Sequence, residues 1–155
     1  MTGRVTIEDL LPHRGTMLLI NTIVQAADDF VQTQSIVTPY WPLVNEAGAN
    51  PIVLIELAAQ TAGICFGWKS MHASPHSAES AGTAPQGWLV GVKRAHFRVG
   101  SIAVQSCITT ESKIAVAVQD YIEVASTCHV GDTQIGEIQL QVLRAEATAF
   151  QGVSG

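Results

Sequence analysis

Charged residues are scarce in this chain of 155 residues, since 14% are Asp, Glu, Lys or Arg while 47% are hydrophobic. The net charge is -5 and the eight Lys and Arg are scattered, so the chain lacks the basic surface that a phosphate backbone requires. We therefore do not expect nucleic acid as a partner. A surface short of charge indicates that another subunit covers part of it, and we expect a homodimer or a higher oligomer.

Cysteine is also rare, with three residues whose number and spacing match neither a zinc site nor a disulfide framework. The five histidines and the scattered acids show no spacing typical of metal ligands. We therefore expect neither a metal nor another cofactor, and we expect the cysteines to be reduced residues of the core.

Long apolar runs are limited to residues 51–68, which carry Glu56, Gln60 and Thr61 in their middle and are barely long enough to span a bilayer. Residues 1–15 are too polar for a signal peptide. We expect one cytoplasmic domain over residues 1–155, without a membrane span.

The same run predicts one long helix over about residues 51–70. Asn50 is a favourable N-cap residue, and Pro51 suits the first helical position. The helix is apolar nearly all round, which is typical of a helix buried on most sides. Glu56 is therefore a lone carboxylate in apolar surroundings, where it requires a partner or a function.

Most of the remaining chain reads as strands, because β-branched and aromatic residues recur along it. Turn residues at 27–29 and 129–132 predict hairpins and hence an antiparallel sheet. Residues 72–87, rich in Ala, Ser, Gly and Pro, predict a mobile loop. The class is α+β. The predicted strands are 17–26, 30–37, 87–97, 101–110, 113–126 and 133–150.

Three segments resemble the β-hydroxyacyl-acyl carrier protein dehydratases of fatty acid synthesis. The first is LLPHRGTMLLINTI at residues 10–23, similar to that family's Leu-Pro-His-Arg-x-x-x-Leu-Leu-Val-Asp, with Asn21 in place of Asp. The second is IELAAQTAG at residues 55–63, similar to Leu-Glu-Ala-Met-Ala-Gln-x-x-Gly. The third is LVGVKRAHF at residues 89–97, similar to Gly-Ile-Asp-Lys-Ala-Arg-Phe. The resemblance implies a hotdog fold, in which a curved antiparallel sheet of about six strands wraps a long central helix.

The resemblance implies a dehydratase of 3-hydroxyacyl thioesters, carried on acyl carrier protein or coenzyme A, in fatty acid or related acyl-chain biosynthesis. In that family a helix Glu works with a His from a neighbouring loop, contributed across the dimer interface, to remove an α-proton and expel the β-hydroxyl. The pair is needed because one group accepts a proton while another donates one. Glu56 stands at the Glu position, and Gln60, one turn on, is placed to orient it.

The family's His stands in Gly-His-Phe-Pro before the helix, where this chain has Tyr40, Trp41 and Pro42. A tyrosine is a far weaker base than imidazole at neutral pH, although it still donates a hydrogen bond. His13 and His96 are the other candidates for the missing partner, and each also fits a structural role. We therefore expect impaired or altered hydro-lyase chemistry, with Glu56, Gln60, Tyr40 and His13 as the catalytic candidates.

Pro51 removes a backbone N–H where the resemblance implies a donor to the thioester carbonyl. Ile52 keeps its amide near the helix start, so we expect this loss to be partial. Trp41, Phe66 and Trp88 are candidate walls of an acyl tunnel, with ordinary core packing as the alternative.

The densest positive cluster predicts where a phosphate-bearing pantetheine arm enters, with a solvated strand edge as the alternative. The cluster comprises Lys93, Arg94 and Arg98, beside His96. Two other functions fit the same sequence. One is a non-catalytic acyl-binding or partner subunit that forms a heterodimer with a catalytic hotdog chain. The other is a hotdog thioesterase, whose attacking water does not need the missing His.

Overall fold

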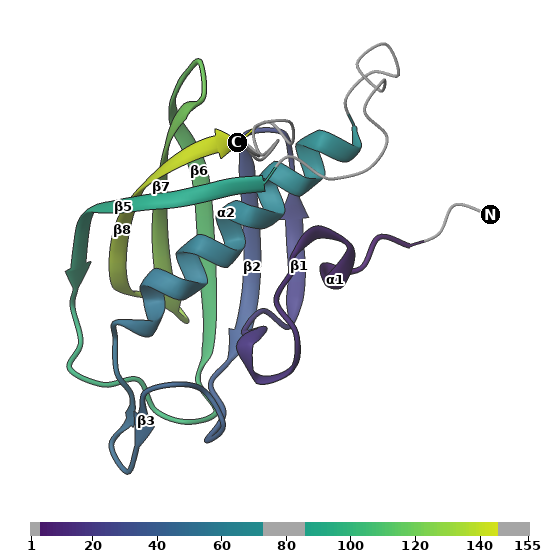
Figure 1. The fold of residues 1–155 in the computed structure, drawn as a ribbon. Helices are drawn as coiled ribbons and strands as arrows, with labels where there is room; N and C mark the ends of the chain where they lie inside the picture. Colours follow the sequence, from purple (N-terminus) through teal and green to yellow (C-terminus); the bar gives the residue numbers. More distant parts are fainter. Residues whose placement is uncertain (1–3, 73–85, 146–155) are drawn as a thin grey trace, which may run out of the picture.

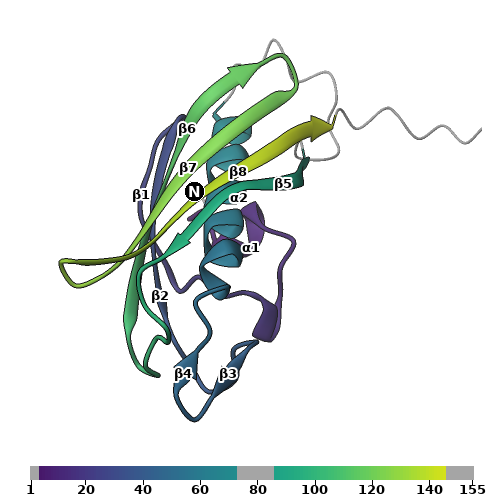
Figure 2. The ribbon, with the colours of Figure 1, turned by 90° about the vertical axis from the view of Figure 1, so that its left-hand side faces the viewer.

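The computed structural model describes residues 4–72 and 86–145. One long helix, α2 (Val53–Met71), lies along the concave face of a curved antiparallel sheet of six strands (Figures 1 and 2). The strand order is β1-β2-β6-β7-β8-β5, so β1 and β5 form the two edges. This is the predicted hotdog fold.

The strands of the sheet are β1 (Thr22–Ala26), β2 (Phe30–Ile36), β5 (Gln86–Phe97), β6 (Cys107–Val118), β7 (Tyr121–Val130) and β8 (Thr133–Ala145). Two short strands, β3 (Val44–Asn45) and β4 (Gly48–Ala49), form a separate hairpin before α2. The N-terminal segment contains the helix α1 (Ile7–Leu10) and a 3-10 turn, Gly15–Met17.

The helix α2 begins two residues later than predicted, because residues 51 and 52 form a turn that leads into it. The side chain of Asn50 still serves this start, since its Oδ1 accepts a hydrogen bond from the Ile52 amide at 3.0 Å. Leu54, Leu57 and Ala58 are fully buried against the sheet in the main hydrophobic core. The prediction of a central, buried helix is confirmed.

The prediction of one strand over residues 113–126 is wrong, because this segment contains the hairpin between β6 and β7. The chain reverses at Gln119 and Asp120, and Gln119 adopts a φ of 53° without the glycine that usually marks such a turn. Residues 101–106, predicted as strand, form a loop with a single β-bridge at Ile102. The loop predicted over residues 72–87 lies largely outside the described residues, as do residues 146–150 of the last predicted strand.

The N-terminal segment packs across α2 through Leu10 and Leu11, which are buried with Ile64 of the helix in a second hydrophobic cluster. Two helix glycines permit this approach. A Cβ at Gly63 would lie 2.7 Å from Leu11 Cδ2, and a Cβ at Gly67 would lie 3.2 Å from the Leu10 carbonyl oxygen. The N-terminal segment therefore lies closer to the axis of α2 than it could if residues 63 and 67 carried side chains.

The β3–β4 hairpin is joined to the loop before β6 by two backbone hydrogen bonds between Ala49 and Ile102, at 2.8 and 3.0 Å. Gly48 has a φ of 115°, and a Cβ there would lie 2.2 Å from the Ile102 carbonyl oxygen. Gly131, in the β7–β8 turn, also has a positive φ of 58° but has open space around it. Gly131 is therefore needed for its backbone conformation alone, whereas at Gly48 a side chain would also clash with Ile102.

We predict that Gly131→Ala lowers the free energy of unfolding by about 1–2 kcal/mol, the cost of a left-handed conformation for a residue with a side chain. Gly48→Ala should cost at least ~1 kcal/mol more, because its Cβ also forces the backbone of Ile102 to move. Urea denaturation followed by circular dichroism measures both. Equal losses in the two variants would contradict the proposed clash.

Candidate active site

A groove of about 700 Å³ lies between the N-terminal segment, α2 and strands β5 and β8. Its polar groups come from the N-terminal segment and the first half of α2, and its apolar walls come from α2 and the two strands. The polar residues are Glu8, Asp9, His13, Arg14 and Glu56, and the larger apolar residues include Leu10, Leu11, Phe66, Leu89, Leu140 and Val142. A polar group beside an apolar trough is typical of a site for an amphipathic small molecule.

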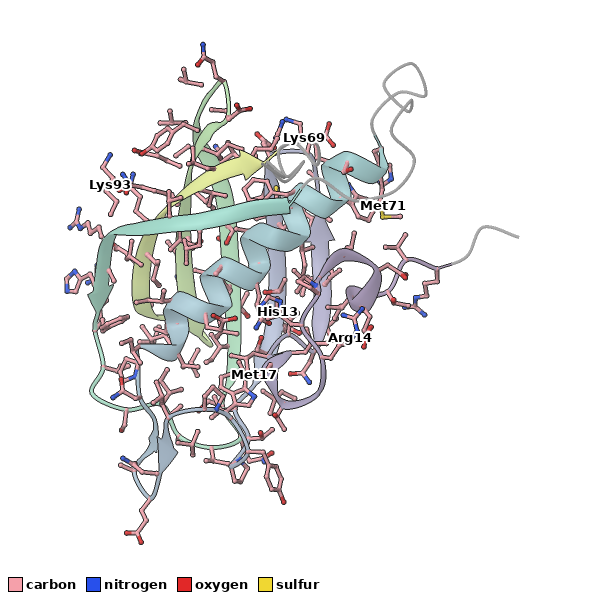
Figure 3. The ribbon with its side chains drawn as sticks, viewed as in Figure 1. His13, Arg14, Met17, Lys69, Met71 and Lys93 are labelled. Carbon is pink, nitrogen blue, oxygen red and sulfur yellow. The ribbon has the colours of Figure 1, made fainter. Side chains whose placement is uncertain are left out.

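His13 and Glu56 meet at the wall of this groove. His13 Nε2 lies 3.3 Å from Glu56 Oε1, and the two side chains are 32% and 38% exposed. Figure 3 shows His13 beside α2, reached from the N-terminal segment. The expectation of a lone, buried carboxylate is therefore wrong, because Glu56 has His13 beside it and this face of α2 opens on the groove instead of on the sheet.

Gln60 holds the carboxylate of Glu56 in place. Its Nε2 donates to Glu56 Oε1 and to the Met17 carbonyl, both at 2.8 Å, and its Oε1 accepts from the Leu19 amide at 3.0 Å. The side chain is completely buried. Among the described residues, Glu56 Oε2 has no hydrogen-bond partner, which leaves one carboxylate oxygen free for a ligand. The predicted orienting contact is present.

The second ring nitrogen of His13 is in an unusual state. His13 Nδ1 is buried and has no hydrogen-bond partner among the described residues. In the neutral tautomer that carries its proton on Nε2, the nitrogen beside Glu56, Nδ1 would be an unpaired acceptor. Buried polar atoms without a partner are rare in folded proteins, and a catalytic role is one reason for them.

Tyr40 and Trp41, which occupy the positions of the family's His-Phe, do not line the groove. Tyr40 is 80% exposed, and Trp41 is buried in the main core. The Ile52 amide, which we expected to be free for a thioester carbonyl, is already bonded to Asn50 Oδ1, and Pro51 is buried. The start of α2 is therefore a closed structural turn.

The predicted positive cluster also lies away from the groove. Lys93 lies on the outer side of β5, away from His13 (Figure 3), and its Nζ lies 2.8 Å from Glu123 Oε1. The hydrogen bond from Lys93 lowers the pKa of Glu123, with a further contribution from the Tyr121 hydroxyl. The same bond raises the pKa of Lys93. Lys93 is thus already paired, so it offers little to a phosphate.

The remaining candidates for the pantetheine entry and the acyl tunnel lie on or beside β5, apart from Phe66 on α2. Arg94 and His96 are exposed and do not line the groove, and Arg98 is paired with Glu137 at 2.9 Å. Phe66 lines the groove and also packs in the main hydrophobic core, so it fits both roles considered for it, tunnel wall and core residue. The side chain of Trp88 lies outside the described residues. The predicted entry for a pantetheine arm beside these residues stays a prediction.

Within residues 4–72 and 86–145, no group of three or more His, Cys, Asp and Glu is arranged to hold a metal ion. No helix in this part of the chain has the length and hydropathy to cross a membrane.

A family model described as ApeP-like, ApeP dehydratase, matches residues 5–152, nearly the whole chain. The chain belongs to the ApeP-like dehydratase family. This confirms the predicted hotdog dehydratase-like family, although the match names ApeP dehydratase and not the enzymes of fatty acid synthesis. No curated protein matches the sequence.

Solved structures confirm the fold of this ApeP-like chain. The dehydratase heterocomplex ApeI:P from Xenorhabdus doucetiae is 19% identical, with a TM-score of 0.77 over 94% of this chain and 95% of that one. A virulence protein from Campylobacter jejuni is 15% identical, with a TM-score of 0.68 over 93% and 98% of the two chains. A hypothetical thioesterase from Streptococcus pneumoniae with coenzyme A is 10% identical, with a TM-score of 0.62 over 80% and 84%.

We predict that Gln60→Leu lowers the free energy of unfolding by about 2–4 kcal/mol, because the Leu19 amide and the Met17 carbonyl each lose a partner that costs ~1–3 kcal/mol to leave unsatisfied. Gln34→Leu is the matched control. Its side chain is exposed on β2, so the expected change is within about 0.5 kcal/mol. Urea denaturation of the two variants checks this, and a small effect of Gln60→Leu would contradict the bonding described above.

Proposed function

We propose that this chain is a hydro-lyase that removes water from 3-hydroxyacyl thioesters, with Glu56 and His13 as its acid–base pair. The distance of 3.3 Å between His13 Nε2 and Glu56 Oε1, at the wall of a groove, is the observation that carries the proposal. Membership of a dehydratase family supports it. Both groups belong to the same chain, whereas the family of fatty acid dehydratases is expected to supply them from two.

The reaction requires two proton transfers. One member of the pair accepts the α-proton of the acyl chain, and the electrons of that C–H bond form the new C=C bond. The other member donates a proton to the β-hydroxyl, which leaves as water when its C–O bond breaks. One member of the pair has then gained a proton and the other has lost one, and transfer of a proton between them, directly or through water, restores the starting state. The products are a 2-enoyl thioester and water.

The apolar wall of the groove gives the acyl chain a place to lie. Phe66, Leu140 and Val142 line the same groove as His13 and Glu56. An acyl tail packed against these apolar residues places carbons 2 and 3 of the acyl chain, where the reaction occurs, beside His13 and Glu56. Glu8 and Asp9 also border the groove and repel phosphate. A phosphate-bearing arm therefore enters away from these two acids.

The expectation of impaired chemistry rested on the absence of the family's His before α2 and on the backbone N–H that Pro51 removes. In this proposal His13 takes that role from the N-terminal segment. The turnover of the wild-type chain therefore decides between impaired chemistry and a working pair of His13 and Glu56.

We predict that His13→Gln and Glu56→Gln each lower kcat/KM for a 3-hydroxyacyl thioester by about 10²–10⁴-fold, the usual contribution of general acid–base catalysis. Loss of one water from the acyl chain, followed by mass spectrometry, measures the rate on N-acetylcysteamine, coenzyme A and carrier-protein thioesters. His129→Gln and Glu46→Gln are matched controls outside the groove and should leave the rate unchanged. Release of free thiol in place of water loss would identify a thioesterase and contradict the proposal.

Coexpression of the His13→Gln and Glu56→Gln chains tests whether the pair belongs to one chain. If it does, no mixed assembly contains an intact pair, and activity stays at the level of the single variants. If the two groups come from different chains, a mixed dimer regains one intact site and activity rises well above that level. Such a rise would overturn the assignment of the pair to a single chain.

We further propose that a second hotdog chain, a copy of this one or a homologous dehydratase subunit, pairs along β5. This strand is an edge of the sheet and exposes Leu89, Val90 and Val92. Unpaired apolar edges invite strand pairing. The similarity to the ApeI:P heterocomplex supports a partner of the same fold. Because Leu89 lines the groove, the second chain would border the site.

We predict that Val90→Asp shifts the purified chain from dimer to monomer, because it places a charge in the proposed junction. Val24→Asp is the matched control, since Val24 is exposed to a similar degree on β1 at the other edge of the sheet. Analytical ultracentrifugation at micromolar concentration measures both variants. If they dissociate to the same extent, the junction does not lie at β5.

A further inference from the structure

Arg14 binds three backbone carbonyls around the residue that carries the imidazole. Its Nη1 donates to the carbonyl oxygens of Leu11 and His13, the latter at 2.8 Å, and its Nη2 donates to the carbonyl oxygen of Glu8 at 2.9 Å. Two of these carbonyls belong to the end of α1, where no further turn of helix satisfies them. The third belongs to His13 itself.

The other end of α1 is held as well. The carboxylate of Asp9 accepts hydrogen bonds from the amide and the hydroxyl of Thr6, both at 2.8 Å. These bonds, the backbone one first, lower the pKa of Asp9. The short helix is thus fixed at its start by Thr6 and Asp9 and at its end by Arg14.

A chain of contacts runs from α2 to His13 and back. Leu10 and Leu11 seat the end of α1 on Gly63 and Gly67 of α2. Arg14 then joins that end to the His13 carbonyl. His13 returns to α2 at Glu56.

From this geometry we infer that Arg14 is a positioning residue, which acts through His13 by fixing its backbone at the distance where the imidazole meets Glu56. The inference rests on the proposed function for its effect on the reaction. The effect on the distance between the two side chains can be measured without any reaction. A shift of about 1 Å at a catalytic group is enough to cost on the order of 100-fold in rate.

The fork of the guanidinium, and not its charge, carries this role. Three carbonyls in two directions match the planar array of donors on arginine, whereas a lysine offers one point of charge on a flexible stem. Arg14→Lys therefore keeps the positive charge at the groove but loses the clamp. A role in attracting a negatively charged ligand would survive in Arg14→Lys, and a positioning role would not.

The kinetic test compares Arg14→Lys and Arg14→Gln with wild type on a 3-hydroxyacyl N-acetylcysteamine thioester, which carries no phosphate. We expect kcat to fall about 10–100-fold in both variants, with KM changed by no more than about threefold, because the groove walls are intact. Arg144→Gln, at the end of β8 and outside the groove, is the matched control and should match wild type. Wild-type kcat in Arg14→Lys would overturn the inference.

The second test does not depend on activity. Nitrogen-15 NMR of the imidazole follows His13, whose signals are identified by their loss in His13→Gln. Glu56→Gln should shift these signals strongly in the wild-type background. In the Arg14→Gln and Arg14→Lys backgrounds the same substitution should shift them by less than a third as much. An equal shift in all backgrounds would show that the two side chains meet without Arg14, and would overturn the inference even if the chain proves to be an active hydro-lyase.

Thermal unfolding of the same variants guards against a general loss of structure. Arg14 is exposed, so its substitution leaves both hydrophobic clusters intact. We expect cooperative unfolding and well-dispersed NMR spectra in both variants. If wild type proves inactive while the NMR shift depends on Arg14 as described, the proposed function fails and the positioning role stands.

Discussion

The close packing of the N-terminal segment on α2 decides the geometry of the site. Leu10 and Leu11 reach the helix because Gly63 and Gly67 carry no side chain. Glycine inside a helix costs about 1 kcal/mol relative to alanine, so this contact must return at least that much through the apolar surface it buries. Together with the bonds that Arg14 and Gln60 make to the backbone around it, this contact holds residue 13 against residue 56. The site therefore depends on a packing interaction more than one helical turn away from its chemistry.

One face of α2 both carries the carboxylate of the site and receives the N-terminal segment. Glu56, Gln60, Gly63 and Gly67 recur at spacings of four, three and four, which places them on a single face of the helix. The first two provide the carboxylate and its hydrogen-bonded support, and the last two provide the seat for the segment. Gln60 also bonds the backbone after that segment, at Met17 and Leu19, so the loop that holds His13 is attached on both sides. A loop held in this way keeps its imidazole in place at little cost in entropy when a ligand binds.

The apolar helix and the strand patterns are strong local signals and were enough to predict an α+β class, while the resemblance of three segments to a known family implied the hotdog fold. The sequence was not enough to predict the turn at Gln119 and Asp120, because the residue with the positive φ is a glutamine and Asp120 alone is a weak turn signal within an apolar, β-branched run. The pairing of Gln60 with Glu56 followed from their spacing on a helix. The pairing of His13 with Glu56 did not, because it depends on how a distant segment packs. The two glycines four residues apart can be seen in the sequence, but the sequence does not show that Leu10 and Leu11 pack beside them.

The unusual residues before α2 and the contact between His13 and Glu56 are related, because both follow from where the groove lies on the helix. A helix start that binds a thioester carbonyl needs free amides, but here Pro51 has none and Asn50 occupies the amide of Ile52. Tyr40 is exposed and Trp41 is buried in the core, so the loop before α2 brings neither side chain to Glu56 of its own chain. The groove instead runs along the side of the helix, where the N-terminal segment supplies the imidazole. If the partner of Glu56 comes from that segment, as proposed, the loop before α2 has no acid–base role in its own chain, and the burial of Trp41 and the hydrogen bond of Asn50 serve the stability of the fold.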